Sequence, residues 1–515
     1  MPSRLYTLSI AVVLTLSSAW AAGKDNAQAR VMSRQTLQDK IKGGWAGQMI
    51  GVSYGAPTEF RVMGKINEEP LAWAPDRIEN AIHQDDLYVE MTLARVMDTV
   101  GLNATSAQYG EMFKDSKYGL WHANAAARRV LNQGIQSPLS GHPKYNIHAN
   151  DIDFQIEADF IGLMCPGLPR ASNQFCDRVG RVMNYGDGLY GGMFVGGMYA
   201  CGYFETDPRR VVEAGLACIP AKSKYGLLIH DLLDWSAKFP DDWRKVWQMI
   251  EDKWDKDDPC PDGALGPFNI DAKLNGAYIA FGLLFGKGDF LKTVEIATRC
   301  GQDSDCNPSS TAGVLGVMLG YSHIPEEFTS GIPKLADTKF EFTDYSLSTI
   351  CDSTMERALA LIRKNGGRVT TTEVVIPYQA PKAPKLEQWN PGIPDRKIGA
   401  KDAAWSWNGS WTDDKGTMVS KAARNEAILK FNGVAVAIIG RLSQDGGRAD
   451  VYLDGRKVAV ADAYIVPNTH DNALWHTYGL RPGEHTLKIV TLGKADSRSK
   501  GQVVAISLAV VYRKP

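Results

Sequence analysis

The amino-acid sequence predicts a multidomain protein in which an all-helical domain is followed by an antiparallel β-sandwich. Apolar residues recur at helical spacing through much of the chain up to Lys364. A proline-rich connector then runs from Thr370 to Ala400, and proline disfavours both helix interiors and central strands. From Trp405 onward, apolar and polar residues alternate between turn signals, as expected for the strands of a sandwich.

Length and charge are compatible with this division. A chain of 515 residues allows two or more domains with sizeable cores. The formal net charge of -1, without a basic run, argues against a nucleic-acid partner. We predict a signal peptide at 1–21, a helical catalytic domain at 33–367, a linker at 368–400 and a β-sandwich at 401–515.

The first segment has the features of a secretory signal peptide. Arg4 precedes the uncharged apolar run from Leu5 to Leu16, and Ala19-Trp20-Ala21 follows as an A-x-A cleavage site. A membrane anchor is the alternative, but the run is short for a spanning helix. We therefore expect a periplasmic or secreted protein with no stable membrane insertion after cleavage.

Two acidic sites lie at the ends of the first predicted helices. A glycine-rich helix between Gly43 and Phe60 ends in a turn that presents Glu59. Asp85 and Asp86 then immediately precede a second helix, for which Gly101 supplies a stop. The apolar residues of that helix follow helical spacing: Leu87, Met91, Ala94 and Met97.

A further acidic group lies between Asn150 and Leu163. Asn150, Asp153 and Glu157 share one face of a predicted helix at spacings of three and four residues, beside a largely apolar face. This polar face either lines a cleft or is simply the solvent face. The sequence leaves both interpretations open.

Asp303 and Asp305 precede another predicted helix, with Asn307 as its N-cap and Pro308 at its first position. Glycines in this helix indicate close packing and burial, where unpaired carboxylates are costly. One such pair is more often a solvated acidic loop. Three acidic helix ends instead favour a convergent cation site, and oxygen ligands suit magnesium, calcium or manganese.

These motifs, in this order, resemble the ADP-ribosylglycohydrolase family between Leu37 and Arg363. The resemblance includes the turn at Pro57–Phe60, the aspartate pair and the final Asp-x-Asp. It implies an all-helical enzyme with one or two divalent cations, magnesium first, with calcium or manganese as alternatives. The implied metal ligands are Gln84, Asp85, Asp86, Asp303 and Asp305.

The resemblance also implies roles for other residues. Glu59, Asp86 and Asp303 are the catalytic candidates. The substrate-binding candidates come from an Asn-containing helix start, from the 150–163 segment and from a later glycine-rich segment: Asn124, Asn150, Asp153, Glu157, Asn184 and Tyr190.

Several positions depart from the family pattern. Threonine usually flanks the paired aspartates, but this chain has Gln84 and Leu87, and Cys306 replaces a third threonine. Val52 stands where the family commonly has aspartate, and Ala125 where it has glycine. A thiol suits a hard cation poorly, so these changes predict a divergent substrate and an altered metal site.

The C-terminal half resembles galactose-binding-like or carbohydrate-binding modules. Its tryptophans are either sugar-stacking residues or, as we favour, packing residues: Trp405, Trp407, Trp411 and Trp475. Eight cysteines fit an oxidising compartment, and Cys165–Cys176 and Cys300–Cys306 are candidate disulfides.

These features together predict a secreted, metal-dependent glycoside hydrolase. Its substrate is expected to be a carbohydrate or a ribosylated small molecule, cleaved at an N- or O-glycosidic bond of a ribosyl-like or other furanosyl sugar. The alternative is a catalytically inactive protein of the same fold that binds a sugar or ADP-ribose.

Overall fold

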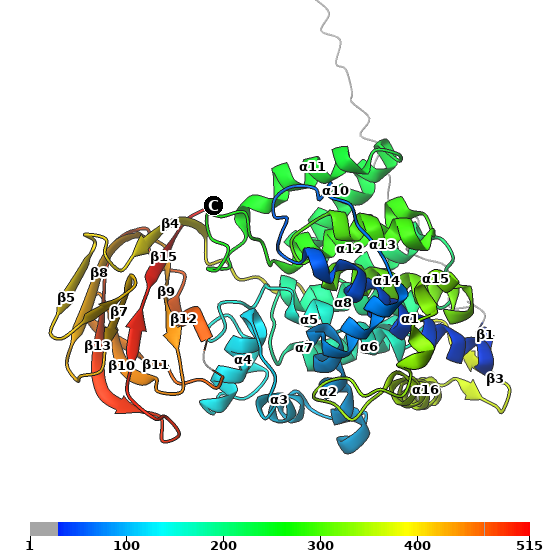
Figure 1. The fold of residues 1–515 in the computed structure, drawn as a ribbon, viewed down its shortest axis with the longest axis horizontal. Coiled ribbons are helices and arrows are strands. Elements are labelled where there is room, and N and C mark those ends of the chain that lie inside the picture. Colours follow the sequence, from blue (N-terminus) through cyan, green and yellow to red (C-terminus); the bar gives the residue numbers. More distant parts are fainter. Residues whose placement is uncertain (1–28, 468) are drawn as a thin grey trace, which may run out of the picture.

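A computed structural model describes residues 29–467 and 469–515. Helices make up the first part of this structure and antiparallel sheets the second, which confirms the predicted fold class (Figure 1). The predicted signal peptide lies outside the described residues. Within the described part of the chain, none of the helices has the length and apolarity needed to cross a membrane.

The helical domain consists of α-helices joined by loops and short 3-10 turns, including η1 (Ala56–Thr58) and η2 (Pro75–His83). Its α-helices are, in chain order, α1 (Arg34–Gly55), α2 (Asp85–Val100), α3 (Ser106–Lys114), α4 (His122–Asn132), α5 (Asp153–Ile156), α6 (Asp159–Leu163), α7 (Pro169–Gly180), α8 (Asp187–Gly202), α9 (Pro208–Leu216), α10 (Lys224–Lys238), α11 (Trp243–Trp254), α12 (Ala272–Gly286), α13 (Phe290–Arg299), α14 (Cys306–Leu319), α15 (Glu326–Thr329) and α16 (Leu347–Lys364).

A stripe of glycines brings the backbones of α1 and α14 into direct contact. Glycines at every fourth position of α1 share one helical face. A Cβ atom on Gly43 would lie 2.3 Å from the carbonyl oxygen of Gly316, and one on Gly47 would lie 2.2 Å from that of Ala312. A Cβ atom on Gly51 would lie 2.1 Å from the carbonyl oxygen of Pro308, and one on Gly55 would lie 1.9 Å from that of Ser304. The two helices therefore run antiparallel in close contact, and α14 is buried as predicted.

Helix ends follow local capping in most places. Asp289 caps α13, accepting a hydrogen bond from the backbone N–H of Lys292 at 2.8 Å. Helix α2 stops at Gly101, as predicted. Helix α14 begins at Cys306, two residues before the predicted first position, because the Asn307 side chain does not cap it. Its amide instead donates to Asn275 Oδ1 at 2.8 Å in the core.

The strands form four antiparallel sheets: β1-β3-β2, β11-β10-β13-β8-β5, β12-β9-β15-β4 and β14-β7-β6. Their bounds are β1 (Arg30–Ser33), β2 (Arg368–Val369), β3 (Glu373–Ile376), β4 (Ile393–Gly399), β5 (Trp405–Asn408), β6 (Thr412–Asp414), β7 (Thr417–Ser420), β8 (Glu426–Gly433), β9 (Ala435–Leu442), β10 (Gly447–Leu453), β11 (Arg456–Asp462), β12 (Thr469–Thr477), β13 (Gly483–Ala495), β14 (Val504–Ile506) and β15 (Leu508–Arg513).

The two largest sheets pack face to face around one apolar core. Leu429 and Ile489 from the first sheet and Val436 and Val511 from the second belong to this core. Trp405 is 5% exposed within it, which confirms packing as the role of this tryptophan. Three other tryptophans pack against the same core: Trp407, Trp411 and Trp475.

The predicted linker is extended and takes part in sheets at both of its ends. Strand β3 pairs with both β1 and β2 beside the helical domain, and β4 joins the sandwich. Between them, the chain runs along the helical domain. Glu387 forms an ion pair with Arg181 at 2.7 Å, and Trp389 Nε1 donates to Asn150 Oδ1 at 3.0 Å.

The sandwich rests on α4 and on the loop that precedes α12 (Figure 1). Arg129 donates to the carbonyl oxygen of Ala473 at 2.5 Å, and the Tyr512 hydroxyl donates to that of Pro259 at 2.9 Å. Ile147 and Ala264 share an apolar cluster with residues of β9 and β15. The two domains therefore meet through a buried surface.

The candidate disulfides are not formed in this structure. All eight cysteines are free, so neither the Cys165–Cys176 nor the Cys300–Cys306 pair is bonded. Seven of these cysteines are buried, which is the usual packing role of a small apolar side chain.

Candidate active site

The acidic residues predicted from three helix ends converge in space. Asp85 and Asp86 are the first residues of α2, and Asp303 and Asp305 lie just before the first turn of α14. Ligand atoms of Asp85, Asp86 and Cys306 lie within 4.8 Å of one another, as do those of Asp303, Asp305 and Cys306. Cys306 therefore lies between the two aspartate pairs.

The contact between α1 and α14 places Glu59 beside this cluster. Where α1 ends, the hydroxyl oxygens of Thr58 and Ser304 lie 2.7 Å apart. The backbone N–H of Phe60 donates to the carbonyl oxygen of Gln302 at 3.0 Å. The turn that carries Glu59 is thus bonded to the loop that carries Asp303.

The acidic cluster has little compensation within the protein. Asp86, Asp303 and Asp305 are almost completely buried, Asp85 is half-buried and Glu59 is exposed at the rim. Both carboxylate oxygens of Asp86, and Oδ1 of Asp303 and of Asp305, have no hydrogen-bond partner among the described residues. Such a cluster is costly unless a positive charge joins it.

The pKa values reflect this crowding. Burial and the carboxylate of Asp305 raise the pKa of Asp85 to about 6. Burial raises the pKa of Asp86 and of Asp303 well above the usual range, and neighbouring carboxylates add to the effect. Desolvation, Asp305 and Asp85 raise the pKa of Glu59 to about 8, and solvent screens part of this effect at the rim.

This donor set fits a divalent cation of the hard class. Carboxylate oxygens are the ligands that magnesium, calcium and manganese prefer. No ion pair neutralises these carboxylates within the part of the chain that the structure describes. Gln84 is the N-cap residue of α2 and lies next to Asp85, with its side chain half-buried.

A second polar group lies beside the cluster. The carboxylate of Asp153 accepts hydrogen bonds from the backbone N–H groups of Ala123 and Asn124 at 3.1 and 2.9 Å. The Asn124 side chain donates to Glu157. Burial raises the pKa of Glu157 well above its usual range, and Asp153 and Asp85 contribute to the shift.

The structure decides between the two interpretations of segment 150–163. Asp153 and Glu157 are 6% and 1% exposed, so they do not form a solvent face. The predicted single helix is wrong, because the segment forms two short helices, α5 and α6, separated by Glu157 and Ala158. Asp153 instead uses its carboxylate to hold the first turn of α4.

Asn184 lies elsewhere and has a structural role. Its amide nitrogen donates to the carbonyl oxygens of Ala149 and Asp151 at 3.0 and 2.7 Å. Its amide oxygen accepts from the backbone N–H of Phe154 at 3.0 Å. These bonds hold the loop before α5, where no acidic-cluster residue is involved.

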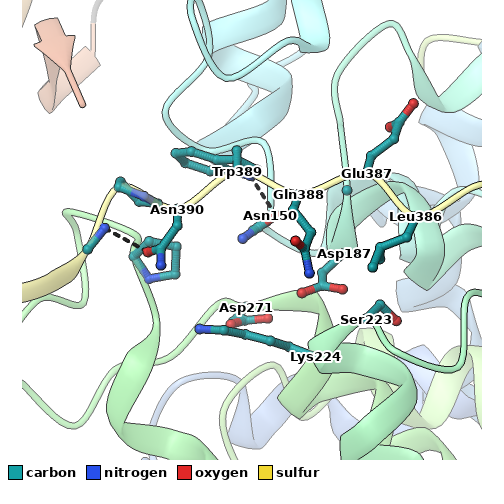
Figure 2. A pocket seen from close by; sticks show the side chains of 14 residues that line it. Asn150, Asp187, Ser223, Lys224, Asp271, Leu386, Glu387, Gln388, Trp389 and Asn390 are labelled. Atoms are coloured by element: carbon teal, nitrogen blue, oxygen red, sulfur yellow. Dashed lines mark hydrogen bonds between the residues drawn. The ribbon is translucent and has the colours of Figure 1, made fainter. Parts of the chain in front are cut away.

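Tyr190 and Asn150 contact the linker rather than the acidic cluster. The Tyr190 hydroxyl accepts from the backbone N–H of Glu387 at 2.6 Å. Figure 2 shows Asn150 under Trp389, in a separate pocket roofed by linker residues. Asp187, Ser223, Lys224 and Asp271 line the opposite side of this pocket.

Aromatic contacts link Phe60, which follows Glu59 in the chain, to the start of α4. The rings of Phe60 and Phe268 lie 5.1 Å apart, and Phe268 lies 5.7 Å from the ring of His122. Trp121, the N-cap residue of α4, is 57% exposed. Trp121 is not among the predicted site residues, although its position three residues before Asn124 is a signal visible in the sequence.

The helical part of the chain matches a known protein family. A family model described as ADP-ribosylglycohydrolase matches residues 33–363. A search of curated proteins found no match. Among solved structures, one titled "ADP-ribosylglycohydrolase-related protein complex" has a TM-score of 0.41 and 12% identity, covering 63% of this chain and 99% of that chain.

Two further solved structures are similar to smaller parts of the chain. A xanthan lyase from Paenibacillus has a TM-score of 0.19 and 12% identity, covering 27% of this chain and 15% of that chain. A family two carbohydrate esterase from Cellvibrio japonicus has a TM-score of 0.16 and 14% identity, covering 22% of this chain and 32% of that chain.

Proposed function

Because this chain belongs to the ADP-ribosylglycohydrolase family, whose members have a glycohydrolase-like function, we propose that it is a metal-dependent glycoside hydrolase. Its proposed substrate carries a ribosyl-like or other furanosyl sugar in an N- or O-glycosidic bond. The observation that carries this proposal is the convergence of two aspartate pairs around Cys306, with Glu59 at the rim.

Asp85, Asp86, Asp303 and Asp305 are the proposed ligands of one or two divalent cations, magnesium first. A bound cation supplies Lewis acidity and a template for the vicinal hydroxyls of a sugar. Cys306 is a soft donor among hard ones, so we assign it no ligand role toward magnesium. The catalytic candidates Asp86 and Asp303 would act as ligands that hold the cation in this site.

Glu59 is the proposed proton-transfer residue. Among the five carboxylates of the cluster, it is the one exposed at the rim. Cleavage of a glycosidic bond needs a carboxyl group that can exchange a proton with the leaving group or with a water molecule. Glu59 is accessible to both, whereas Asp153 and Glu157 are buried and already bonded to α4.

Asn124 is the proposed contact to the sugar. Its Oδ1 atom is buried and has no hydrogen-bond partner among the described residues, while its Nδ2 donates to Glu157. A hydrogen bond from a ligand hydroxyl would remove the desolvation cost of this buried, unpaired acceptor. The exposed ring of Trp121 offers an adjacent apolar face for a sugar or base.

We further propose that the protein acts in the periplasm or outside the cell. Support comes from Arg4 and the apolar run Leu5 to Leu16, which have the pattern of a secretory signal. Carbohydrate is the proposed partner of the sandwich. Trp405 is not proposed as a contact, since it packs inside the core.

The test is hydrolysis of ribosyl, arabinofuranosyl and ADP-ribosyl glycosides, with magnesium, manganese or calcium against a chelator. We expect metal-dependent sugar release, lost by a factor of at least about a hundred in Asp303→Ala, since metal-site residues act as a unit. Asp241→Ala is the matched control, because Asp241 is exposed and pairs with Lys287. It should release sugar at the wild-type rate.

Failure to release sugar from any of these glycosides, by a folded protein shown to bind metal, would overturn the proposal. Calorimetric titration with ADP-ribose and with free sugars would then be decisive. Binding without turnover would favour the inactive sugar-binding protein, for which the substitutions at Leu87 and Cys306 are the sequence evidence.

A further inference from the structure

A second group of metal-binding side chains lies outside the acidic cluster. Its members are His122 at the start of α4, His148 and Asp151 in the loop before α5, and Cys260 in the loop before α12. One ligand atom from each of these four residues lies within 4.8 Å of all the others. They come from three segments that are far apart in the sequence.

Three of the distances between donor atoms are close to those expected around one tetrahedral ion, and the fourth, between Asp151 and His148, is that of a hydrogen bond. Asp151 Oδ2 lies 2.8 Å from His148 Nδ1, 3.2 Å from Cys260 Sγ and 3.8 Å from His122 Nδ1. Cys260 Sγ lies 3.6 Å from His148 Nδ1. Bond lengths of about 2.0–2.3 Å from zinc to nitrogen, oxygen and sulfur place tetrahedral ligands about 3.3–3.6 Å apart.

Three of the four donors are buried, and the donor atoms are directed at one another. His148, Asp151 and Cys260 are each 0% exposed. The nitrogen and sulfur atoms all approach a single oxygen of Asp151, whereas its Oδ1 is buried without a hydrogen-bond partner among the described residues. Nε2 of His148 also has none, so Nδ1 is the nitrogen through which this ring interacts.

We propose that His122, His148, Asp151 and Cys260 form a tetrahedral zinc site. One thiolate, two imidazole nitrogens and one carboxylate are donors that zinc accepts, and the thiolate disfavours magnesium and calcium. The two negative charges of Cys260 and Asp151 balance a divalent ion. His122 Nδ1 also lies 3.1 Å from Asp262 Oδ2, a contact that metal binding exchanges for the ion.

The site has the character of a structural zinc site. All four positions of the tetrahedron are taken by protein ligands, which leaves none for water or substrate. The ion joins the first residue of α4 to the loop that carries Cys260, next to Pro259. Since Tyr512 of the sandwich donates to the Pro259 carbonyl oxygen, zinc also fixes the surface on which the sandwich rests. This inference does not depend on the proposed function.

The test uses the purified full-length protein and a serine substitution at each of two buried cysteines. Elemental analysis of the wild type should find one tightly held zinc per chain. Cobalt in place of zinc should give the near-ultraviolet charge-transfer band of a cobalt–thiolate bond. Cys260→Ser should lose both the zinc and the band, whereas Cys306→Ser, which alters the acidic cluster, should keep both.

Each result decides the proposal. A folded wild type that holds no stoichiometric zinc after exposure to it, or that binds cobalt without the thiolate band, would overturn the site. Loss of the band in Cys306→Ser but not in Cys260→Ser would assign the thiolate to the acidic cluster and also overturn it. The wild-type spectrum keeps the test valid even if Cys260→Ser does not fold.

Discussion

The backbone of Gly51 in α1 touches the carbonyl oxygen of Pro308 in α14 so closely that a Cβ atom at Gly51 would lie 2.1 Å from that oxygen. No side chain fits between these helices. Because α1 leads through η1 to Glu59 and α14 begins beside Asp305, the separation of the two helices sets the distance between the rim carboxylate and the buried aspartates.

Gly51→Ala should therefore destabilise the protein and impair the acidic site together. Overpacking costs about 1–3 kcal/mol, more where backbone must move, so we expect a lower melting temperature and weaker binding of divalent metal. Gly266→Ala is the control, since its Cβ would meet only the carbonyl oxygen of Gly263, at 3.4 Å. A Gly51→Ala protein as stable as Gly266→Ala would contradict this account of the helix contact.

Asp303→Asn should stabilise the metal-free protein while removing its response to metal. The substitution takes one charge out of a buried acidic cluster that lacks a compensating cation. In chelator at pH 8 we expect the melting temperature of the variant to exceed that of the wild type. Added magnesium should raise only the wild-type value, by mass action.

Asp241→Asn is the control for this pair of measurements. Asp241 is exposed and pairs with Lys287, so its removal should alter neither value. A wild-type melting temperature that does not change when magnesium, manganese or calcium is added would contradict the assignment of a cation to the acidic cluster.

Glu251 gives a pH-dependent contribution to stability outside both metal sites. Burial raises its pKa from 4.5 to about 8, although the Tyr278 hydroxyl donates a hydrogen bond to it. A carboxyl whose pKa is raised on folding stabilises fully below its unfolded pKa, and that stability is lost as pH rises through the folded pKa. Wild type should thus lose stability between about pH 4.5 and pH 8.

Glu251→Gln should flatten this part of the curve, because the amide does not ionise. Calorimetric melting temperatures from pH 5 to pH 8.5 check the prediction, with Glu111→Gln as an exposed control. Parallel curves for wild type and Glu251→Gln would show that the buried carboxyl does not govern this window.

Tyr512→Phe should weaken the contact between the two domains. The buried hydroxyl donates to the Pro259 carbonyl oxygen at 2.9 Å, and its loss leaves that acceptor unpaired. A cost of about 1 kcal/mol is expected. Limited proteolysis near the linker should become faster, whereas Tyr378→Phe, at a residue 38% exposed, should behave as wild type.

The convergence of Glu59 with the aspartates was predictable because each acid lies at the end of a recognisable helix. Local pattern also predicted the end of α2 at Gly101. Asn184 and Tyr190 were different, since their partners are a remote loop and the linker. No spacing in the sequence reports contacts of that kind.

The group of His122, His148, Asp151 and Cys260 could not be predicted from the sequence either. Its residues come from the start of α4 and from two loops, and only His148 and Asp151 are close in sequence, three residues apart. Only packing of the loop before α12 against α4 brings them together. Trp121 differs from these cases, because its nearness to Asn124 is visible in the sequence.

Strand pairing between β1 and β3, with Ser33 opposite Glu373, brings the two ends of the helical domain together. The two ends of that domain meet at one place on its surface. A chain entering and leaving a domain at adjacent points makes the domain portable, since it can be inserted into another protein or circularly permuted with little rearrangement. The sandwich is joined to this domain by one segment of the chain, which runs from β3 along the helical domain to β4, so the sandwich can be added, exchanged or removed without reopening the helical fold.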